Sequence, residues 1–227
     1  MDVLEALKAR KSIRGFEPDP VPREVLSEIL EVACRAPSAV NSQAWEFFVL
    51  AGDVLEKVKR ANVEKVRSGA APSPEHRIMG WPRGSVYRQR QVALAQQLFR
   101  LMEVPRDGDE KKRQWMERGF RFFDAPAAIV ILVDRSLGES APLLDIGAVM
   151  QSICLAALSR GLGTCIEDQG VMYPQVVRDL AGIPDSKRII ISIAIGYPDW
   201  DFPANRVETL REPLESTTTW CGFEAKG

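Results

Sequence analysis

Residues 145–160 constrain the fold of this chain more than any other segment. They read D-I-G-A-V-M-Q-S-I-C-L-A-A-L-S-R and are almost entirely apolar or small. A helix that is apolar on nearly every side must be covered all round, either within a core or by a second subunit. Gly161 follows directly and suits a left-handed C-terminal cap. We therefore expect a buried helix over this segment.

Three short runs rich in β-branched and aromatic residues predict buried strands, at 45–50, 127–133 and 189–195. Apolar spacing predicts a first helix that begins near Val3, carries Ile13 and ends in a basic cluster. A second helix is expected to open at Pro22 and to stop near Ala36, before Pro37. Strands separated by helices predict a layered α/β fold in the broad sense, with parallel or antiparallel order left open.

The chain of 227 residues has the length of one domain, and no linker or repeat divides it. We expect a single domain over 1–227. The stretch 68–109 differs from its surroundings: it is polar, basic and proline-containing before a helical pattern resumes. Long excursions of this kind often cover active sites, and we expect this one to do so.

The charge balance excludes some classes of partner. Thirty basic and thirty-one acidic residues leave a net charge of -1, so no global field favours nucleic acid or an anionic membrane. No run reaches the roughly 18 to 20 apolar residues of a membrane-spanning helix. The charged start, 1–14, argues against a secretory signal. Four scattered cysteines predict neither a metal site nor a disulfide framework, and they favour a cytoplasmic setting.

The first segment that could carry chemistry is Arg10-Lys11-Ser12-Ile13-Arg14. Guanidinium groups and a hydroxyl match phosphate oxygens, and each charge-assisted bond contributes about 1.5 to 3 kcal/mol. The alternative is a solvated basic helix end, because cations commonly finish helices. On this segment alone the alternative is the more common case.

The second segment, A-P-S-A-V-N-S-Q-A-W at 36–45, joins a predicted helix to a predicted strand. Asn41 and Gln43 carry both donors and acceptors, so they could recognise a heteroaromatic edge that alternates C=O and N–H groups. A turn that closes on its own backbone explains the composition equally well.

Taken together, the two segments resemble the amino-terminal pattern of the FMN-dependent nitroreductase family in residue type, order and spacing. Two later motifs agree: G-L-G-T-C at 161–165 and R-E-P-L-E at 211–215. The four motifs are in the family order and cover nearly the whole chain.

The resemblance implies a mixed α+β sandwich that works as a homodimer, with two FMN sites built across the interface and the helix at 145–160 at its centre. It assigns the FMN phosphate and ribityl chain to Arg10, Lys11, Ser12, Arg14 and Arg211. It implies that Ser38, Asn41 and Gln43 reach the flavin of the neighbouring subunit. It places Ile166, Glu167 and Asp168 beside the isoalloxazine ring.

The chain also departs from the family pattern. Ala44 stands where many members have proline, which relaxes one turn. Glu167 and Asp168 are harder to interpret, because a carboxylate beside the pyrimidine edge would oppose an anionic reduced flavin.

The implied activity is the transfer of hydride from NADH or NADPH, through FMN, to a nitroaromatic, quinone-like or similarly electron-poor molecule. The cofactor performs the chemistry, so no catalytic side chain is assigned. Neither a Rossmann fingerprint nor a Walker loop is present, and the single histidine, His76, gives little support for a Ser-His-Asp triad. Five aromatic residues lie in or after the excursion, and core packing is the more common role for most of them: Trp81, Tyr87, Phe120, Phe122 and Phe123. As candidates for substrate contact we name Trp81, Tyr87 and Phe123.

Two alternatives remain open. Members of the same fold carry out reductive dehalogenation or break down flavin. A flavin-binding protein without turnover is an alternative from another class.

Overall fold

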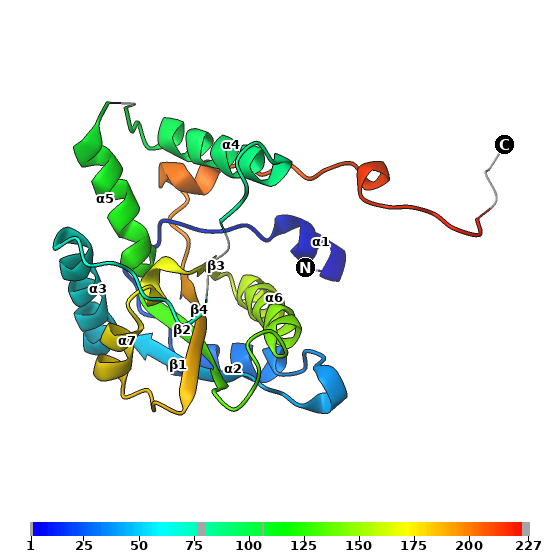
Figure 1. Ribbon diagram of the computed structural model, residues 1–227, viewed down its shortest axis with the longest axis horizontal. Coiled ribbons are helices and arrows are strands. Elements are labelled where there is room, and N and C mark those ends of the chain that lie inside the picture. The colour runs from blue at the N-terminus through cyan, green and yellow to red at the C-terminus, as the bar shows by residue number, and fades with distance from the viewer. Residues whose placement is uncertain (1, 77–79, 106, 224–227) are drawn as a thin grey trace.

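A four-stranded antiparallel sheet forms the centre of the computed structural model, which describes residues 2–76, 80–105 and 107–223 (Figure 1). Its strand order is β1-β2-β4-β3, and each neighbouring pair is antiparallel. The strands are β1 (Glu46–Ala51), β2 (Ala127–Asp134), β3 (Gly163–Glu167) and β4 (Lys187–Gly196). The sequence predicted β1, β2 and β4 to within two residues. It did not predict β3, which is short and opens on a glycine.

Helices cover both faces of this sheet, as the α+β prediction requires. Helices α2 and α6 pack together on one face, and α3 and α7 pack together near the other. The helices are α1 (Val3–Ala9), α2 (Arg23–Ala33), α3 (Gly52–Arg67), α4 (Val86–Leu101), α5 (Asp109–Phe120), α6 (Leu143–Ser159) and α7 (Pro174–Ala181). Among the residues described, no helix is both long enough and apolar enough to cross a membrane.

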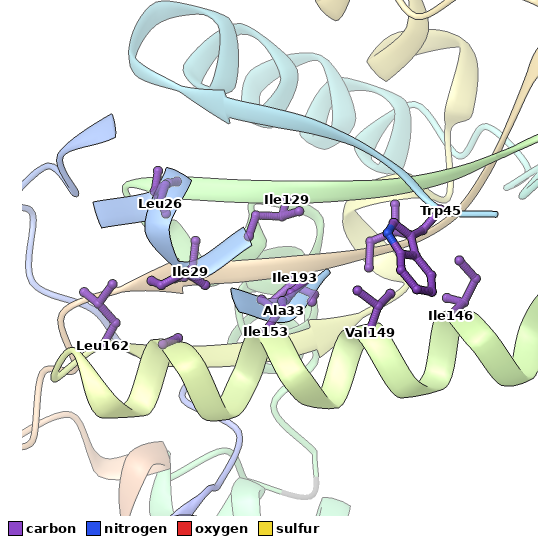
Figure 2. Close-up of a cluster of buried hydrophobic side chains, with 14 of the residues drawn as sticks. Leu26, Ile29, Ala33, Trp45, Ile129, Ile146, Val149, Ile153, Leu162 and Ile193 are labelled. Carbon is purple, nitrogen blue, oxygen red and sulfur yellow. The ribbon is translucent and has the colours of Figure 1, made fainter. Parts of the chain in front are cut away.

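Strand β2 shows why its sequence is apolar without alternation. Ile129 and Ile131 belong to the core cluster under α2 and α6, whereas Val130 and Leu132 belong to the cluster under α3 and α7. Both faces of the strand are therefore buried, and each fully buried aliphatic side chain contributes about 1.5 to 3 kcal/mol. Figure 2 shows the first cluster, in which Ile146, Val149 and Ile153 of α6 point towards the sheet.

Two predicted helix ends are wrong. The first helix ends at Ala9, so the basic cluster lies in extended chain rather than within a helix end. Ile13 is 2% exposed because the Ile13 amide donates to the Thr164 carbonyl (2.9 Å), which draws this segment onto β3. The second helix ends at Ala33, earlier than Ala36, and the chain leaves it through a short turn.

Helix α6 has one face that its own protomer does not cover. Leu144 is 86% exposed, and a Cβ built on Gly147 would meet no atom within 4 Å. Half-buried residues continue this face at helical spacing: Ala148, Gln151, Leu155 and Leu158. We call this face, from Leu144 to Leu158, the α6 stripe. The expected cover on every side is thus only partly supplied within one chain.

The excursion is tied back to the body at both ends. At its start, the hydroxyl of Tyr173 donates to the Ala70 carbonyl (2.8 Å), and Arg178 pairs with Glu75 (2.8 Å). Further on, Leu98 of α4 and Trp115 of α5 share a third core cluster with Val207. Helix α4 is thereby fixed against the carboxy-terminal segment.

Candidate functional site

A cavity of about 210 Å³ lies between the amino-terminal basic cluster, α4 and the carboxy-terminal segment. It gathers five residues that the sequence had grouped by motif, along with three that it had not. The lining residues are Arg10, Lys11, Ser12, Arg14, Leu94, Val207, Thr209 and Arg211. We refer to it as the anion cavity.

The chemistry of this cavity suits a phosphate. Its walls carry four cationic side chains and the hydroxyls of Ser12 and Thr209, and its lining contains no carboxylate. Guanidinium forks match phosphate oxygens, and a dianion would offset the mutual repulsion of the cations. Arg211 is preorganised by bonds from Nη1 to the Thr209 Oγ1 (3.0 Å) and to the Leu210 carbonyl (3.1 Å).

The amino-terminal side of the cavity is held by β3. Ser12 forms an isolated parallel bridge with Thr164, and Phe16 forms an antiparallel bridge with Pro198. Because a strand rises about 3.3 Å per residue, Glu167 lies about 10 Å along β3 from Thr164, the residue that pairs with Ser12. The anion cavity therefore lies beside the start of β3, and the Ile166–Asp168 segment lies at the end of the same strand.

Glu167 is a buried carboxyl at the end of β3, and burial raises its pKa to about 8. Its Oε2 accepts from the Gly170 amide (2.7 Å), and the hydroxyl of Ser192 lies against Oε1 (2.5 Å). At neutral pH the protonated form of Glu167 is therefore favoured. Burial also raises the pKa of the half-buried Asp168, and His76 partly offsets that shift. The predicted conflict between two carboxylates and an anionic flavin is correspondingly reduced.

The Ser38–Gln43 segment lies apart from the anion cavity of its own chain. It is strained, with positive φ at Val40, Asn41 and Gln43, and it is anchored by the buried Asp145 at the start of α6. Asp145 accepts from the Ala39 amide (3.2 Å) and from the Ser42 hydroxyl (3.2 Å). Val40 is 99% exposed. Strain of this kind persists where surrounding contacts fix it, and it is common at ligand sites.

The length of α6 gives the separation between the Ser38–Gln43 loop and the anion cavity. A second cavity, of about 250 Å³, shares Arg10 and Lys11 with the anion cavity and is also lined by Leu158. Asp145 and Leu158 are separated by about 20 Å at 1.5 Å per helical residue. The loop and the cavity are thus near opposite ends of one helix.

The three predicted substrate residues separate into two groups. Trp81 and Tyr87 are 43% and 53% exposed, and their ring centroids lie 5.2 Å apart. Phe123 is instead buried in the core and lies 5.9 Å below the guanidinium of Arg14. Its position agrees with core packing, the alternative that the sequence had also left open.

Sequence reasoning did not identify Leu94, Val207 or Thr209 as lining residues. Thr209 lies two residues before Arg211, but a threonine in a polar tail gives no signal by itself. Leu94 belonged to the helical pattern of the excursion, and its position over the cavity depends on tertiary packing. Within the described part of the chain, no group of three or more His, Cys, Asp or Glu side chains could hold a metal ion.

Comparison with known proteins identifies the family of this chain. The model of the nitroreductase family matches residues 7–197. This chain belongs to the nitroreductase family. Nitrobenzene nitroreductase of Ectopseudomonas oleovorans is 34% identical over 95% of both chains.

Other nitroreductases are similar along the whole length. The 4-nitrobenzoate reductase of Pseudomonas putida is 28% identical over 98% of this chain and 97% of its own. Among solved structures, the FMN and NADPH-dependent nitroreductase NfnB from sphigopyxis sp. strain HMH superposes with a TM-score of 0.91 at 30% identity. It covers 98% of this chain and 100% of its own. The nitroreductase fold predicted from the motifs is thereby confirmed.

Proposed function

We propose that this nitroreductase is an FMN-dependent oxidoreductase that uses NADH or NADPH to reduce nitroaromatic, quinone-like or related electron-poor molecules. One observation carries the proposal: the anion cavity brings the residues assigned to the FMN phosphate into one site, although they come from opposite ends of the chain. The relatives named above are nitrobenzene, nitrobenzoate and FMN and NADPH-dependent nitroreductases, which supports the same activity.

The residues present fit FMN. Arg10, Lys11, Arg14 and Arg211 would neutralise the phosphate, and Ser12 would donate a further hydrogen bond. At the far end of the site, the Ile166–Asp168 segment at the end of β3 would face the ring system. There the neutral form of Glu167 avoids placing a full negative charge near a reduced flavin. When bound, FMN supplies the redox chemistry by passing electrons from the nicotinamide to the acceptor.

We also propose a homodimer, supported by apolar surface that one protomer leaves uncovered. The α6 stripe is one such surface. The segment after Val207 is another, because it leaves the body of the molecule (Figure 1) and carries Leu210 at 94%, Trp220 at 63% and Phe223 at 71% exposure. Exposed apolar side chains of this kind are typical of subunit interfaces.

The Ser38–Gln43 loop supports a site shared between subunits. It lies about 20 Å along α6 from the surroundings of its own anion cavity. Its strained and exposed backbone suits contact with the flavin of the second protomer, as the resemblance implied for Ser38, Asn41 and Gln43.

The excursion is proposed to cover the acceptor site of this single domain. Leu94 of α4 already lines the anion cavity, and Tyr87 lies two helical turns earlier on the same face. The exposed Trp81–Tyr87 pair is therefore well placed to contact an aromatic acceptor. We place the protein in the cytoplasm, in keeping with four cysteines that are all free in the structure.

A direct test uses flavin-loaded protein with NADH or NADPH and a panel of nitroaromatics, quinones and halophenols. We expect a yellow protein that sustains steady-state oxidation of the nicotinamide when a nitroaromatic or quinone is present. A colourless protein that takes up no added FMN would refute the proposal. A single stoichiometric oxidation would instead indicate a flavin carrier, whereas halide release or oxygen-dependent flavin loss would favour the other activities of this fold.

A further inference from the structure

We infer that Asn205 is a positioning residue for cofactor binding: together with Arg118, it fixes the main chain of Arg14 so that the Arg14 guanidinium faces the anion cavity. This inference rests on the proposed function, and it assigns a role to two residues that do not line the cavity.

Asn205 is 2% exposed and uses its full hydrogen-bonding capacity on the backbone. Its Oδ1 accepts from the Arg14 amide (2.7 Å) and from the Gly15 amide (3.2 Å). Its Nδ2 donates to the Gly15 carbonyl (2.8 Å) and to the Asp199 carbonyl (2.7 Å). One side chain thereby satisfies the polar groups of a segment about 190 residues away in sequence.

Arg118 of α5 holds the other polar group of Arg14. Its Nη2 donates to the Arg14 carbonyl (3.1 Å), and its Nη1 pairs with Asp124 (2.7 Å). The guanidinium carbon of Arg118 lies 4.5 Å from the centroid of the Phe202 ring. The amide and the carbonyl of Arg14 are thus both bound to side chains rather than to a strand partner.

Gly15 makes this arrangement possible. A Cβ at this position would lie 2.2 Å from the Phe202 ring, so any larger residue would push the segment away from Asn205. The close approach keeps residues 14 and 15 against the segment that leads to Arg211.

The consequence concerns the Arg14 side chain. Its guanidinium makes a long contact with the Ser12 carbonyl (3.4 Å) and forms no ion pair with any residue that the structure describes. The bonds from this guanidinium to a phosphate would weaken steeply as their angles depart from linearity, so the position of Arg14 matters for binding. A fixed main chain therefore lowers the ordering cost of phosphate binding, because only the side-chain rotamers of Arg14 remain to be fixed.

The test compares two flavins that differ by one phosphate. For the full-length chain and for Asn205→Ala, dissociation constants are measured for FMN and for riboflavin by fluorescence titration. We expect FMN to bind about tenfold more weakly to the variant, a loss of about 1.4 kcal/mol. Riboflavin affinity should be nearly unchanged, because riboflavin does not use the anion cavity.

Asn62→Ala is the matched control. Asn62 is also a buried asparagine that bonds to backbone, at the Phe120 and Gly170 carbonyls, but it makes no bond to Arg14 or Gly15. Its loss should lower thermal stability without changing the ratio of FMN to riboflavin affinity. If Asn205→Ala does not fold, Arg118→Met is the second variant. It releases the Arg14 carbonyl together with the Phe123 carbonyl and Asp124, leaves the Asn205 bonds in place, and should still reduce FMN affinity selectively.

Equal losses for both flavins, or no loss for either, would overturn the role of Asn205. If wild-type protein itself binds FMN no better than riboflavin, the phosphate assignment fails and the inference fails with it. A wild-type preference for FMN that survives both variants would refute the inference and leave the proposed function intact.

Discussion

Glu167 and Ser192 face each other across the β3–β4 pair, with the serine hydroxyl oxygen 2.5 Å from the glutamate Oε1. The same hydroxyl lies 2.9 Å from the main-chain carbonyl of Glu167. One serine proton can serve only one of these acceptors. A protonated Glu167 supplies the second hydrogen, which is consistent with a pKa raised to about 8 by burial.

This pair predicts a specific dependence of stability on pH. Between the ordinary carboxyl pKa of 4.5 and about 8, the folded state keeps a proton that the unfolded state releases. The contribution of Glu167 to stability is therefore complete below pH 4.5 and decreases as the pH rises through 8, by up to about 1.4 kcal/mol per pH unit. Glu167→Gln should remove this slope, because an amide does not titrate between pH 5 and 9. The glutamine amide can still accept from Gly170 and donate to Ser192, so the contacts of the site are kept. Urea unfolding from pH 5 to 9 measures the difference, and parallel curves would show that Glu167 does not titrate in this range.

Arg14→Ala should weaken FMN binding by about 1.5 to 3 kcal/mol, on the scale of a lost charge-assisted hydrogen bond. Arg23→Ala, an exposed change at the start of α2, serves as the control and should leave the affinity unchanged. Equilibrium titration with FMN provides the measurement. An unaltered dissociation constant for Arg14→Ala would remove this arginine from the cofactor site.

Gly147 on the α6 stripe tests the homodimer. Gly147→Ala meets open space in the protomer and should stabilise the helix by about 0.5 to 1 kcal/mol. Gly147→Glu should fold equally well but should place an unpaired charge in the interface and shift the protein towards monomer. Sedimentation velocity over a dilution series distinguishes the two variants. A Gly147→Glu dimer as tight as wild type would exclude this stripe from the interface.

Trp81→Ala should raise the Michaelis constant for an aromatic acceptor about two- to tenfold, the range expected when one aromatic stacking partner is lost. The bound FMN content should be retained, because Trp81 is 43% exposed and does not line the anion cavity. Trp81→Phe keeps an aromatic ring, so its Michaelis constant should lie between those of wild type and Trp81→Ala. Steady-state kinetics with one nitroaromatic decides the matter, and a variant that loses its fold would show that Trp81 is structural.

The sequence predicted elements whose patterns are local and strong. Strand β2 is a continuous apolar run, β4 carries a run interrupted only by Ser192, and α6 has a composition that is typical of a buried helix. The end of α1 was placed wrongly because Ile13 continues the apolar spacing, yet pairing with Thr164 draws it into extended chain. Tertiary hydrogen bonds of this kind override local propensity and leave no trace in the spacing.

The candidate site shows the same division. The cations of the anion cavity were recognisable because several occur together in a nearly neutral chain. Asn205 could not be found in this way, since its partners, Arg14 and Gly15, lie about 190 residues away. The raised pKa of Glu167 was equally inaccessible, because it depends on burial at the end of β3 and on the position of Ser192 on the paired strand β4.

The union of residues 10–14 with residues 207–211 also bears on how the protein acquires its cofactor. During synthesis, the first cations leave the ribosome roughly 10 to 40 s before Arg211, at about 5 to 20 residues per second. Over that interval the nascent chain carries three of the four cations of the anion cavity and lacks the fourth. We therefore expect tight FMN binding only after Arg211 has emerged, and a product that stops short of Arg211 should bind FMN more weakly.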